Sequence, residues 1–142
     1  MIAGMTEQTP AIPDVGFNKA IGLQFSEVSA DRVVASCEVT PDLLQPYGIV
    51  HGGVYCSMVE ATASYGAAIW FGDRGHVVGV ANHTNFLRAL RGGSVTAVAT
   101  PIHRGRTQQL WQVVVTDDTG RDIARGEVRL ANLASAENLG RG

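Results

Sequence analysis

The sequence lacks the features that mark several large classes of protein. Its 142 residues include 6% aromatic residues, and no run of basic residues accompanies a net charge of -2. It therefore offers neither a basic surface nor stacking platforms for nucleic acid. No stretch reaches the roughly 20 apolar residues of a membrane-spanning helix. We expect a small-molecule partner, with no nucleic acid and no membrane.

Cysteine is also scarce, which bears on where the protein works. Cys37 and Cys56 form no CxxC pair and lie in apolar segments, so we interpret them as buried, reduced thiols. The first 13 residues carry Pro10 and Pro13 but lack the basic start and continuous apolar core of a signal peptide. The sequence predicts a cytoplasmic protein.

The motifs of several common enzyme classes are absent as well. The chain has no G-x-S-x-G elbow, no P-loop and no G-x-G-x-x-G run. Its four histidines show no metal-ligand spacing: His51, His76, His83 and His103. We expect no metal and no other cofactor.

What is present is enough apolar side chain for one domain. Hydrophobic residues make up 45% of the chain and charged residues 17%. We expect one domain over residues 14–134, between flexible tails at 1–13 and 135–142. No internal repeat or linker divides it.

The apolar pattern predicts one long helix among strands. Residues 54–71 contain no proline, and apolar residues recur there at helical spacing, while small residues fill most other positions and would let a sheet pack closely. Runs rich in β-branched residues lie at 32–40, 76–90, 94–106, 108–121 and 122–133. Short turns separate the last four runs, so we expect them to pair as an antiparallel meander. The fold class is α+β, with about five strands and the helix on one face.

One carboxylate stands in the predicted helix. Across residues 43–72 only His51 and Glu60 can carry charge. Glu60 lies two turns after Gly53 on roughly the same face, a separation that a reacting carbonyl group and an attacking water could fill. It can act as base or nucleophile, and Ser64, one turn further, can hold the carboxylate or the water.

Two glycines open this helix. Gly52 and Gly53 leave N–H groups at the positive end of the helix dipole, and their lack of side chains lets a substrate carbonyl approach. Such donors stabilise a developing oxyanion.

Each of these residues also has a plainer interpretation. The two glycines can be a tight turn into a helix, and Glu60 can form a structural salt bridge with an arginine such as Arg88. His51 can hydrogen-bond a loop carbonyl, and Ser64 can pack against the helix's surroundings.

Two segments carry a resemblance to a known family. QPYGIVHGGVYCSMVEATAS and PIHRGRTQQLWQVVVTDDTGR resemble the hot-dog-fold acyl-CoA thioesterases of the phenylacetate-pathway and 4-hydroxybenzoyl-CoA thioesterase group. The resemblance covers about residues 17–133. It implies a sheet wrapped around a long central helix, a homodimer as the minimal active unit with its site between protomers, and usually a homotetramer.

The resemblance also implies roles for residues of the helix and its approach. Glu60 matches the catalytic carboxylate, and Gly53 matches the residue whose backbone N–H polarises the thioester carbonyl. Gln45 and His51 would orient the carbonyl or the water, and Ser64 matches a helper position.

Later segments would bind the substrate. Asn82, Asn85 and Phe86 match a strand that meets the partner's helix, so they are expected to line the acyl pocket from the other chain. Phe86 suggests an apolar acyl or aryl group, and ordinary sheet core is its plainer interpretation. Gly52 would lie against the substrate at the start of the helix.

The HRGR run, residues 103–106, would meet coenzyme A. Arg104 and Arg106 place two guanidinium groups beside His103 at a turn, where they could bind the phosphates; a solvated turn is the plainer interpretation. The expected reaction is hydrolysis of an apolar acyl- or aryl-CoA to the free acid and coenzyme A. The alternative is a non-catalytic acyl-CoA-binding protein, against which Glu60 and Gly53 argue.

Overall fold

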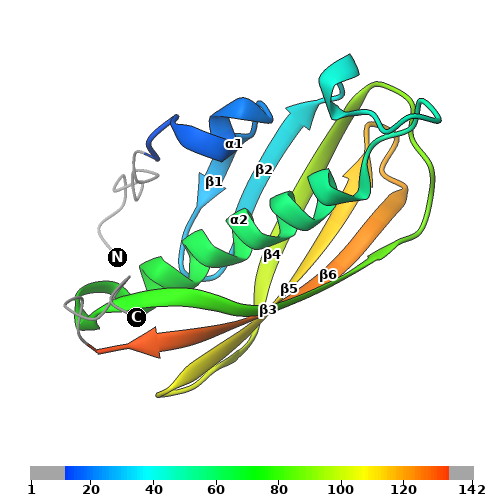
Figure 1. Cartoon of the computed structure of the whole chain (residues 1–142). Helices are drawn as coiled ribbons and strands as arrows, with labels where there is room; N and C mark the ends of the chain where they lie inside the picture. Colours follow the sequence, from blue (N-terminus) through cyan, green and yellow to red (C-terminus); the bar gives the residue numbers. More distant parts are fainter. Residues whose placement is uncertain (1–11, 135–142) are drawn as a thin grey trace, which may run out of the picture.

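A 20-residue helix lies across one face of an antiparallel sheet in the computed structural model, which describes residues 12–134 (Figure 1). This helix, α2 (Gly52–Phe71), begins at an N-cap whose side chain accepts a hydrogen bond from the Gly53 N–H. It ends at Gly72, whose φ of 61° is readily adopted by glycine. The helix predicted over residues 54–71 is thus confirmed. The expected tail at 135–142, and the one at 1–13 up to residue 11, lie outside the described residues.

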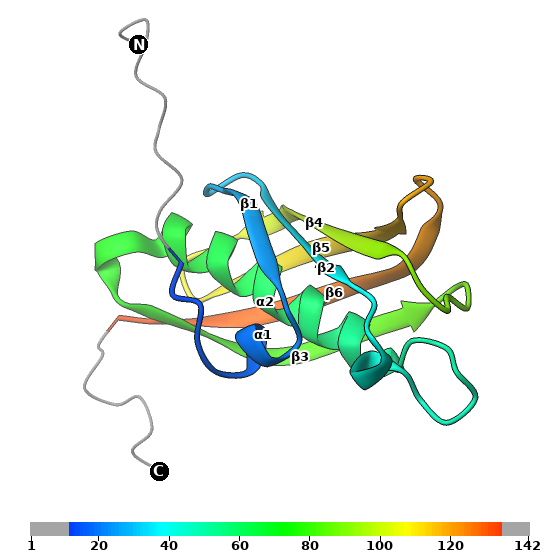
Figure 2. The ribbon, with the colours of Figure 1, turned by 90° about the horizontal axis from the view of Figure 1, so that it is seen from above.

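Six strands form the sheet, in the order β1-β2-β4-β5-β6-β3, and every pairing is antiparallel. The strands are β1 (Gln24–Val28), β2 (Val33–Glu38), β3 (His76–Phe86), β4 (Ser94–Arg104), β5 (Gln108–Asp117) and β6 (Asp122–Leu133). A short helix α1 (Gly16–Ala20) precedes them, and two 3-10 turns, η1 (Pro41–Leu43) and η2 (Gly72–Arg74), flank the α2 region. Seen from above, α2 lies between the β1 and β3 edges with α1 beside it (Figure 2).

This arrangement confirms the expected hot-dog fold but corrects two details. The sheet has a sixth strand, β1, whose five residues gave too short a pattern to be predicted. The predicted meander is confirmed for β4, β5 and β6 but was wrong for β3, because β3 pairs with β6 and β2 takes the place beside β4. The segment after β3 explains this: the Leu87 N–H still bonds the Ile123 carbonyl of β6, and the Leu90 carbonyl accepts from the Val50 N–H. The chain is therefore held along β6 and the approach to α2, and does not turn straight back into β4.

Small residues let the sheet approach α2 closely. A Cβ atom on Gly66 would lie 2.5 Å from the ring of Trp111, which is fully buried. A Cβ atom on Gly126 of β6 would lie 2.7 Å from the Val59 side chain. The helix contacts strands β2 to β6, and ten of its 20 residues are buried, whereas the side that carries Cys56, Glu60 and Ser64 is only half-buried. None of the helices within residues 12–134 has the length and apolarity needed to span a membrane.

A buried polar network ties the turn after β4 to this core. Gln109 is fully buried, and its Nε2 donates to the Ala67 carbonyl at 3.2 Å and to Asn132 Oδ1 at 2.9 Å. Its Oε1 accepts from Trp111 Nε1 at 2.9 Å. Asn132 Nδ2 then donates to the Gly105 carbonyl at 2.9 Å. The orientation of Trp111 and the position of the turn therefore depend on one amide.

Replacing that amide should destabilise the fold. Gln109→Leu leaves the buried Trp111 N–H and Ala67 carbonyl without their partner. We therefore expect the free energy of unfolding to fall by about 2 kcal/mol or more. Denaturant unfolding at fixed protein concentration measures the change. The matched control is Gln112→Leu at an exposed position of the same strand, where a change within about 0.5 kcal/mol is expected. Equal losses in both variants would contradict the role given to Gln109.

Candidate active site

The Glu60 carboxylate lies between α2 and β3. Its Oε2 accepts a hydrogen bond from Asn82 Nδ2 at 3.2 Å. On the strand beneath it, a Cβ atom on Gly79 would lie 2.1 Å from Oε1, so the carboxylate occupies space that only glycine leaves free. Within residues 12–134 no ion pair involves Glu60, so the fold does not form the alternative salt bridge to Arg88.

Glu60 also lines a surface groove of about 510 Å³ between α1 and α2. Ser64 lines the same groove, so the structure brings these two predicted residues together. The other lining residues are Phe17, Asn18, Cys56, Ser57, Ala61 and Tyr65. Two aromatic rings and two helix hydroxyls thus surround the carboxylate, a lining that suits an apolar group with a few polar contacts.

The start of α2 is closed by a histidine. His51 Nδ1 accepts from the Gly53 N–H at 2.8 Å and so caps the helix. Because Nδ1 is the acceptor, a neutral His51 carries its proton on Nε2. The predicted oxyanion donor is therefore occupied by His51, and a substrate carbonyl would have to replace this ring nitrogen. The plainer interpretation gave His51 a hydrogen bond to a loop carbonyl. Within residues 12–134 its side chain makes no such bond and instead accepts from the Gly53 N–H.

Other predicted residues gather in a second pocket at this end of the helix. Gln45, Gly52 and Phe86 line a pocket of about 310 Å³ together with Arg88. The Phe86 ring needs the glycine, because a Cβ atom on Gly52 would lie 2.6 Å from it. Within one chain, Glu60 and the helix N-terminus thus face different pockets, about 10 Å apart along the helix axis.

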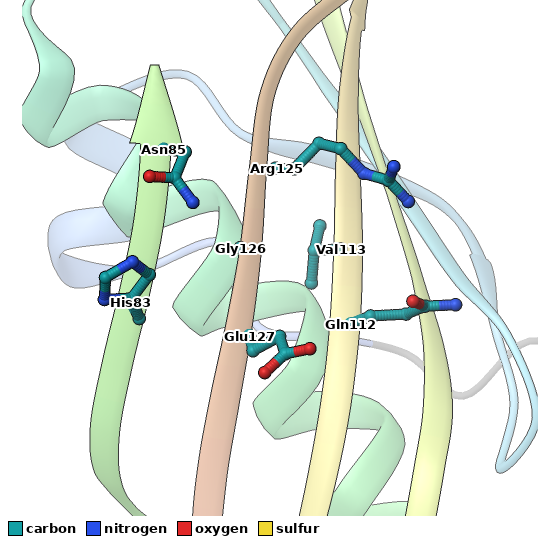
Figure 3. Close-up of a pocket in the computed structure, with 7 residues that line it drawn as sticks. All are labelled: His83, Asn85, Gln112, Val113, Arg125, Gly126 and Glu127. Atoms are coloured by element: carbon teal, nitrogen blue, oxygen red, sulfur yellow. The ribbon is translucent and has the colours of Figure 1, made fainter. Parts of the chain in front are cut away.

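The two asparagines of β3 lie on opposite faces of the sheet. Asn82 faces α2, where its Nδ2 also donates to the Cys56 carbonyl at 3.1 Å. Asn85 lines a pocket of about 390 Å³ with His83, Arg125 and Glu127. Figure 3 views this pocket with α2 behind the strands. Alternation along a strand requires this division, so one chain does not bring Asn82 and Asn85 together.

The HRGR turn holds its two arginines differently. Arg104 donates to the Ala30 carbonyl at 2.8 Å and to Asp31 Oδ1 at 3.0 Å, and its guanidinium lies 5.5 Å from the Trp70 ring centroid. Arg106 is exposed and takes part in no ion pair of the described residues. His103 is exposed beside this turn. Arg104 therefore has a structural role within the chain, whereas Arg106 is available to a ligand.

The two cysteines differ in their surroundings. Both are free, and Cys37 is buried as predicted; burial raises the pKa of its thiol to about 11. The prediction was wrong for Cys56, which is only half-buried and lines the Glu60 groove. It lies one turn before Glu60, where the groove exposes that side of the helix.

Sequence reasoning missed Gly79 and the α1 side of the groove. A glycine inside a strand is a signal of close approach, and could have drawn attention to Gly79. Phe17 and Asn18 carried no such signal, since only the folded chain brings α1 beside α2. No group of three His, Cys, Asp or Glu side chains within residues 12–134 is placed to hold a metal ion.

Comparisons with known proteins point in one direction. The thioesterase superfamily matches residues 47–124, more than half of the chain. The Mycobacterium tuberculosis protein Rv1847 is 52% identical over 84% of this chain and 87% of its own. Its solved structure gives a TM-score of 0.82, with 84% of this chain and 97% of that one covered.

Two further relatives have names that state a reaction. The 1,4-dihydroxy-2-naphthoyl-CoA hydrolase of Listeria monocytogenes is 36% identical over 74% of this chain and 85% of its own. The proofreading thioesterase EntH of Cronobacter turicensis is 31% identical over 71% of this chain and 74% of its own.

An antiparallel sheet wrapped around one long central helix is the hot-dog fold. The chain belongs to the thioesterase superfamily and is a thioester hydrolase. The resemblance noted from the sequence is thereby confirmed.

Proposed function

We propose that the protein hydrolyses the thioester of an apolar acyl- or aryl-CoA to the free acid and coenzyme A. The observation that carries this proposal is the Glu60 carboxylate, which faces a groove with aromatic walls and has no cationic partner among the described residues. Phe17 and Tyr65 suit an aryl or branched acyl group. The name of the Listeria relative, an aryl-CoA hydrolase, supports the same substrate class.

Glu60 can supply the reacting carboxylate in two ways. As a base it takes a proton from water while the water oxygen attacks the thioester carbon; the C–S bond then breaks and the thiolate leaves, taking up a proton. As a nucleophile it attacks the thioester carbon, the C–S bond breaks and the thiolate leaves and takes up a proton; water then cleaves the mixed anhydride to the free acid and regenerates Glu60. Both routes place negative charge on the carbonyl oxygen. The Gly53 N–H stabilises it once His51 Nδ1 has been displaced, with Gln45 and Ser64 as orienting groups.

The active unit is a homodimer in this proposal, and further pairing gives a homotetramer. β3 forms one edge of the sheet, with β6 on its other side, so it can pair with the β3 edge of a second copy. Pairing would join the Glu60 groove of one chain to the helix N-terminal pocket of the other, which includes Phe86. This explains why one chain holds the two halves of the predicted site in separate pockets.

The nucleotide end of coenzyme A is assigned to the HRGR turn. Arg106 is exposed and meets the phosphates, with His103 beside it. Arg104 supports the turn through its hydrogen bonds to Ala30 and Asp31. Phosphate binding, which was expected of both arginines, is therefore assigned to Arg106 alone.

Glu60→Gln should keep the fold and abolish most hydrolysis, because an amide of equal size replaces the base or nucleophile. We expect turnover to fall roughly a hundredfold or more. The assay follows free thiol released from a panel of thioesters that runs from acetyl-CoA to 4-hydroxybenzoyl-CoA. Wild-type turnover in this variant would remove Glu60 from the mechanism.

Mixed dimers test the shared site. Glu60→Gln and Phe86→Ala chains should each be poorly active alone, but a heterodimer retains one site with both residues intact. Random co-assembly in equal amounts should restore about a quarter of wild-type activity, since half the dimers are mixed and each has one working site. Co-expression with two affinity tags isolates the heterodimer. No recovery in it would show that each chain builds its own site.

Arg106→Ala should raise KM for coenzyme A thioesters and leave KM unchanged for a truncated thioester that lacks the nucleotide. Contacts far from the carbonyl supply uniform binding, so kcat should change little. The effect should shrink at high salt, since exposed charges are screened beyond roughly 10 Å at 0.1 M. Arg104→Ala is the matched control: it should lower Tm and affect both substrates alike. An equal loss on both substrates in Arg106→Ala would contradict phosphate binding.

A further inference from the structure

Asn82 holds the Glu60 carboxylate from the neighbouring strand of the same chain. Its amide nitrogen bridges β3 to α2 at two points: the carboxylate oxygen Oε2 and the backbone carbonyl of Cys56, one turn earlier. Both groups are acceptors, so this site on α2 requires a donor from β3. The expected role of Asn82 was to line an acyl pocket, whereas its contact is with the reacting group itself.

Thr84 decides which end of the Asn82 amide faces that carboxylate. Thr84 Oγ1 donates to Asn82 Oδ1 at 2.8 Å, from the same face of β3 two residues further on. If the amide were reversed, its oxygen would point at a carboxylate and a carbonyl, which are both acceptors. The hydroxyl bond to Oδ1 therefore works together with the Glu60 and Cys56 contacts, and all three favour one orientation.

Gly79 limits the carboxylate on its other side. A Cβ atom at this position would lie 2.1 Å from Oε1, far inside van der Waals contact. One oxygen is thus hydrogen-bonded to Asn82, while the other lies directly over backbone that carries no side chain. Together these contacts define the plane and the position of the carboxylate on the groove wall.

We propose that Thr84 and Asn82 form a relay that positions Glu60 for attack on the thioester or for activation of water. The inference rests on the proposed function of Glu60. Thr84 acts through Asn82 and is a positioning residue, and Gly79 leaves the space into which the carboxylate is held. Misplacing a reacting group by about 1 Å can cost a hundredfold in rate, so loss of the relay should appear in kcat.

The test removes the hydroxyl without changing the shape of the side chain. Thr84→Val should lower kcat about tenfold, with KM within about twofold and Tm within about 2 °C of wild type. Thr84→Ser, which keeps the hydroxyl, should restore kcat to within about threefold. Asn82→Leu should lower kcat at least as much as Thr84→Val. The substrate is the best thioester in the panel above.

Thr96→Val is the matched control. Thr96 is a threonine of β4 that alternates with the buried Val95 and Ala97, so it lies on the sheet face away from α2. The same substitution there should leave kcat, KM and Tm at wild-type values. A similar fall in kcat would show that valine in this sheet affects the enzyme generally, and would overturn the relay.

A double variant separates positioning from a purely structural role. In a Glu60→Gln background, Thr84→Val should cause no further loss of the residual rate, because no carboxylate remains to be positioned. An equal loss in both backgrounds would overturn the relay. So would an unchanged kcat in Thr84→Val while Glu60→Gln is inactive, and that result would leave the proposed function intact. Wild-type turnover in Glu60→Gln would instead overturn the proposed function and the relay with it.

Discussion

Close approach between α2 and the sheet is the constraint on which the rest of this structure depends. The approach is possible because side chains are missing at the contact points: Trp111 packs on Gly66, and Val59 packs on Gly126. At Gly79 the same device accommodates the polar Glu60 in place of an apolar side chain. Packing and chemistry therefore use one principle, in which a glycine on one element admits a large or functional group from the other.

That closeness has an electrostatic consequence. Glu60 is half-buried between helix and strand, where a hydrogen bond compensates the carboxylate for the part of its hydration that it loses. The fold supplies a neutral amide from Asn82 and no cation within the described residues. An arginine would have tied the carboxylate into a structural ion pair, as Asp31 ties Arg104, whereas an amide orients it and leaves its charge for the reaction.

The Glu60 groove and the pocket at the helix N-terminus are separate in one chain, which gives the free edge of β3 a role in the proposed active site. In a single chain, Glu60 and Gly52 line separate pockets. In the proposed dimer the exposed β3 edge would serve both assembly and catalysis. At the HRGR turn, Arg104 and the Gln109 network hold the backbone that carries Arg106.

The sequence by itself determined the class of fold, the bounds of the long helix and the identity of its one carboxylate, because these are local properties of spacing, propensity and charge. It also carried the family resemblance. Only the tertiary structure decided that β3 pairs with β6, that His51 occupies the Gly53 N–H, and that Asn82 rather than Asn85 is the asparagine facing α2. Those outcomes depend on which distant segments meet, and local pattern does not contain strand order or the partner of a side chain. Asn82 shows the difference: its position on a strand was predictable, but its bond to Glu60 exists only because the folded sheet brings β3 beside α2.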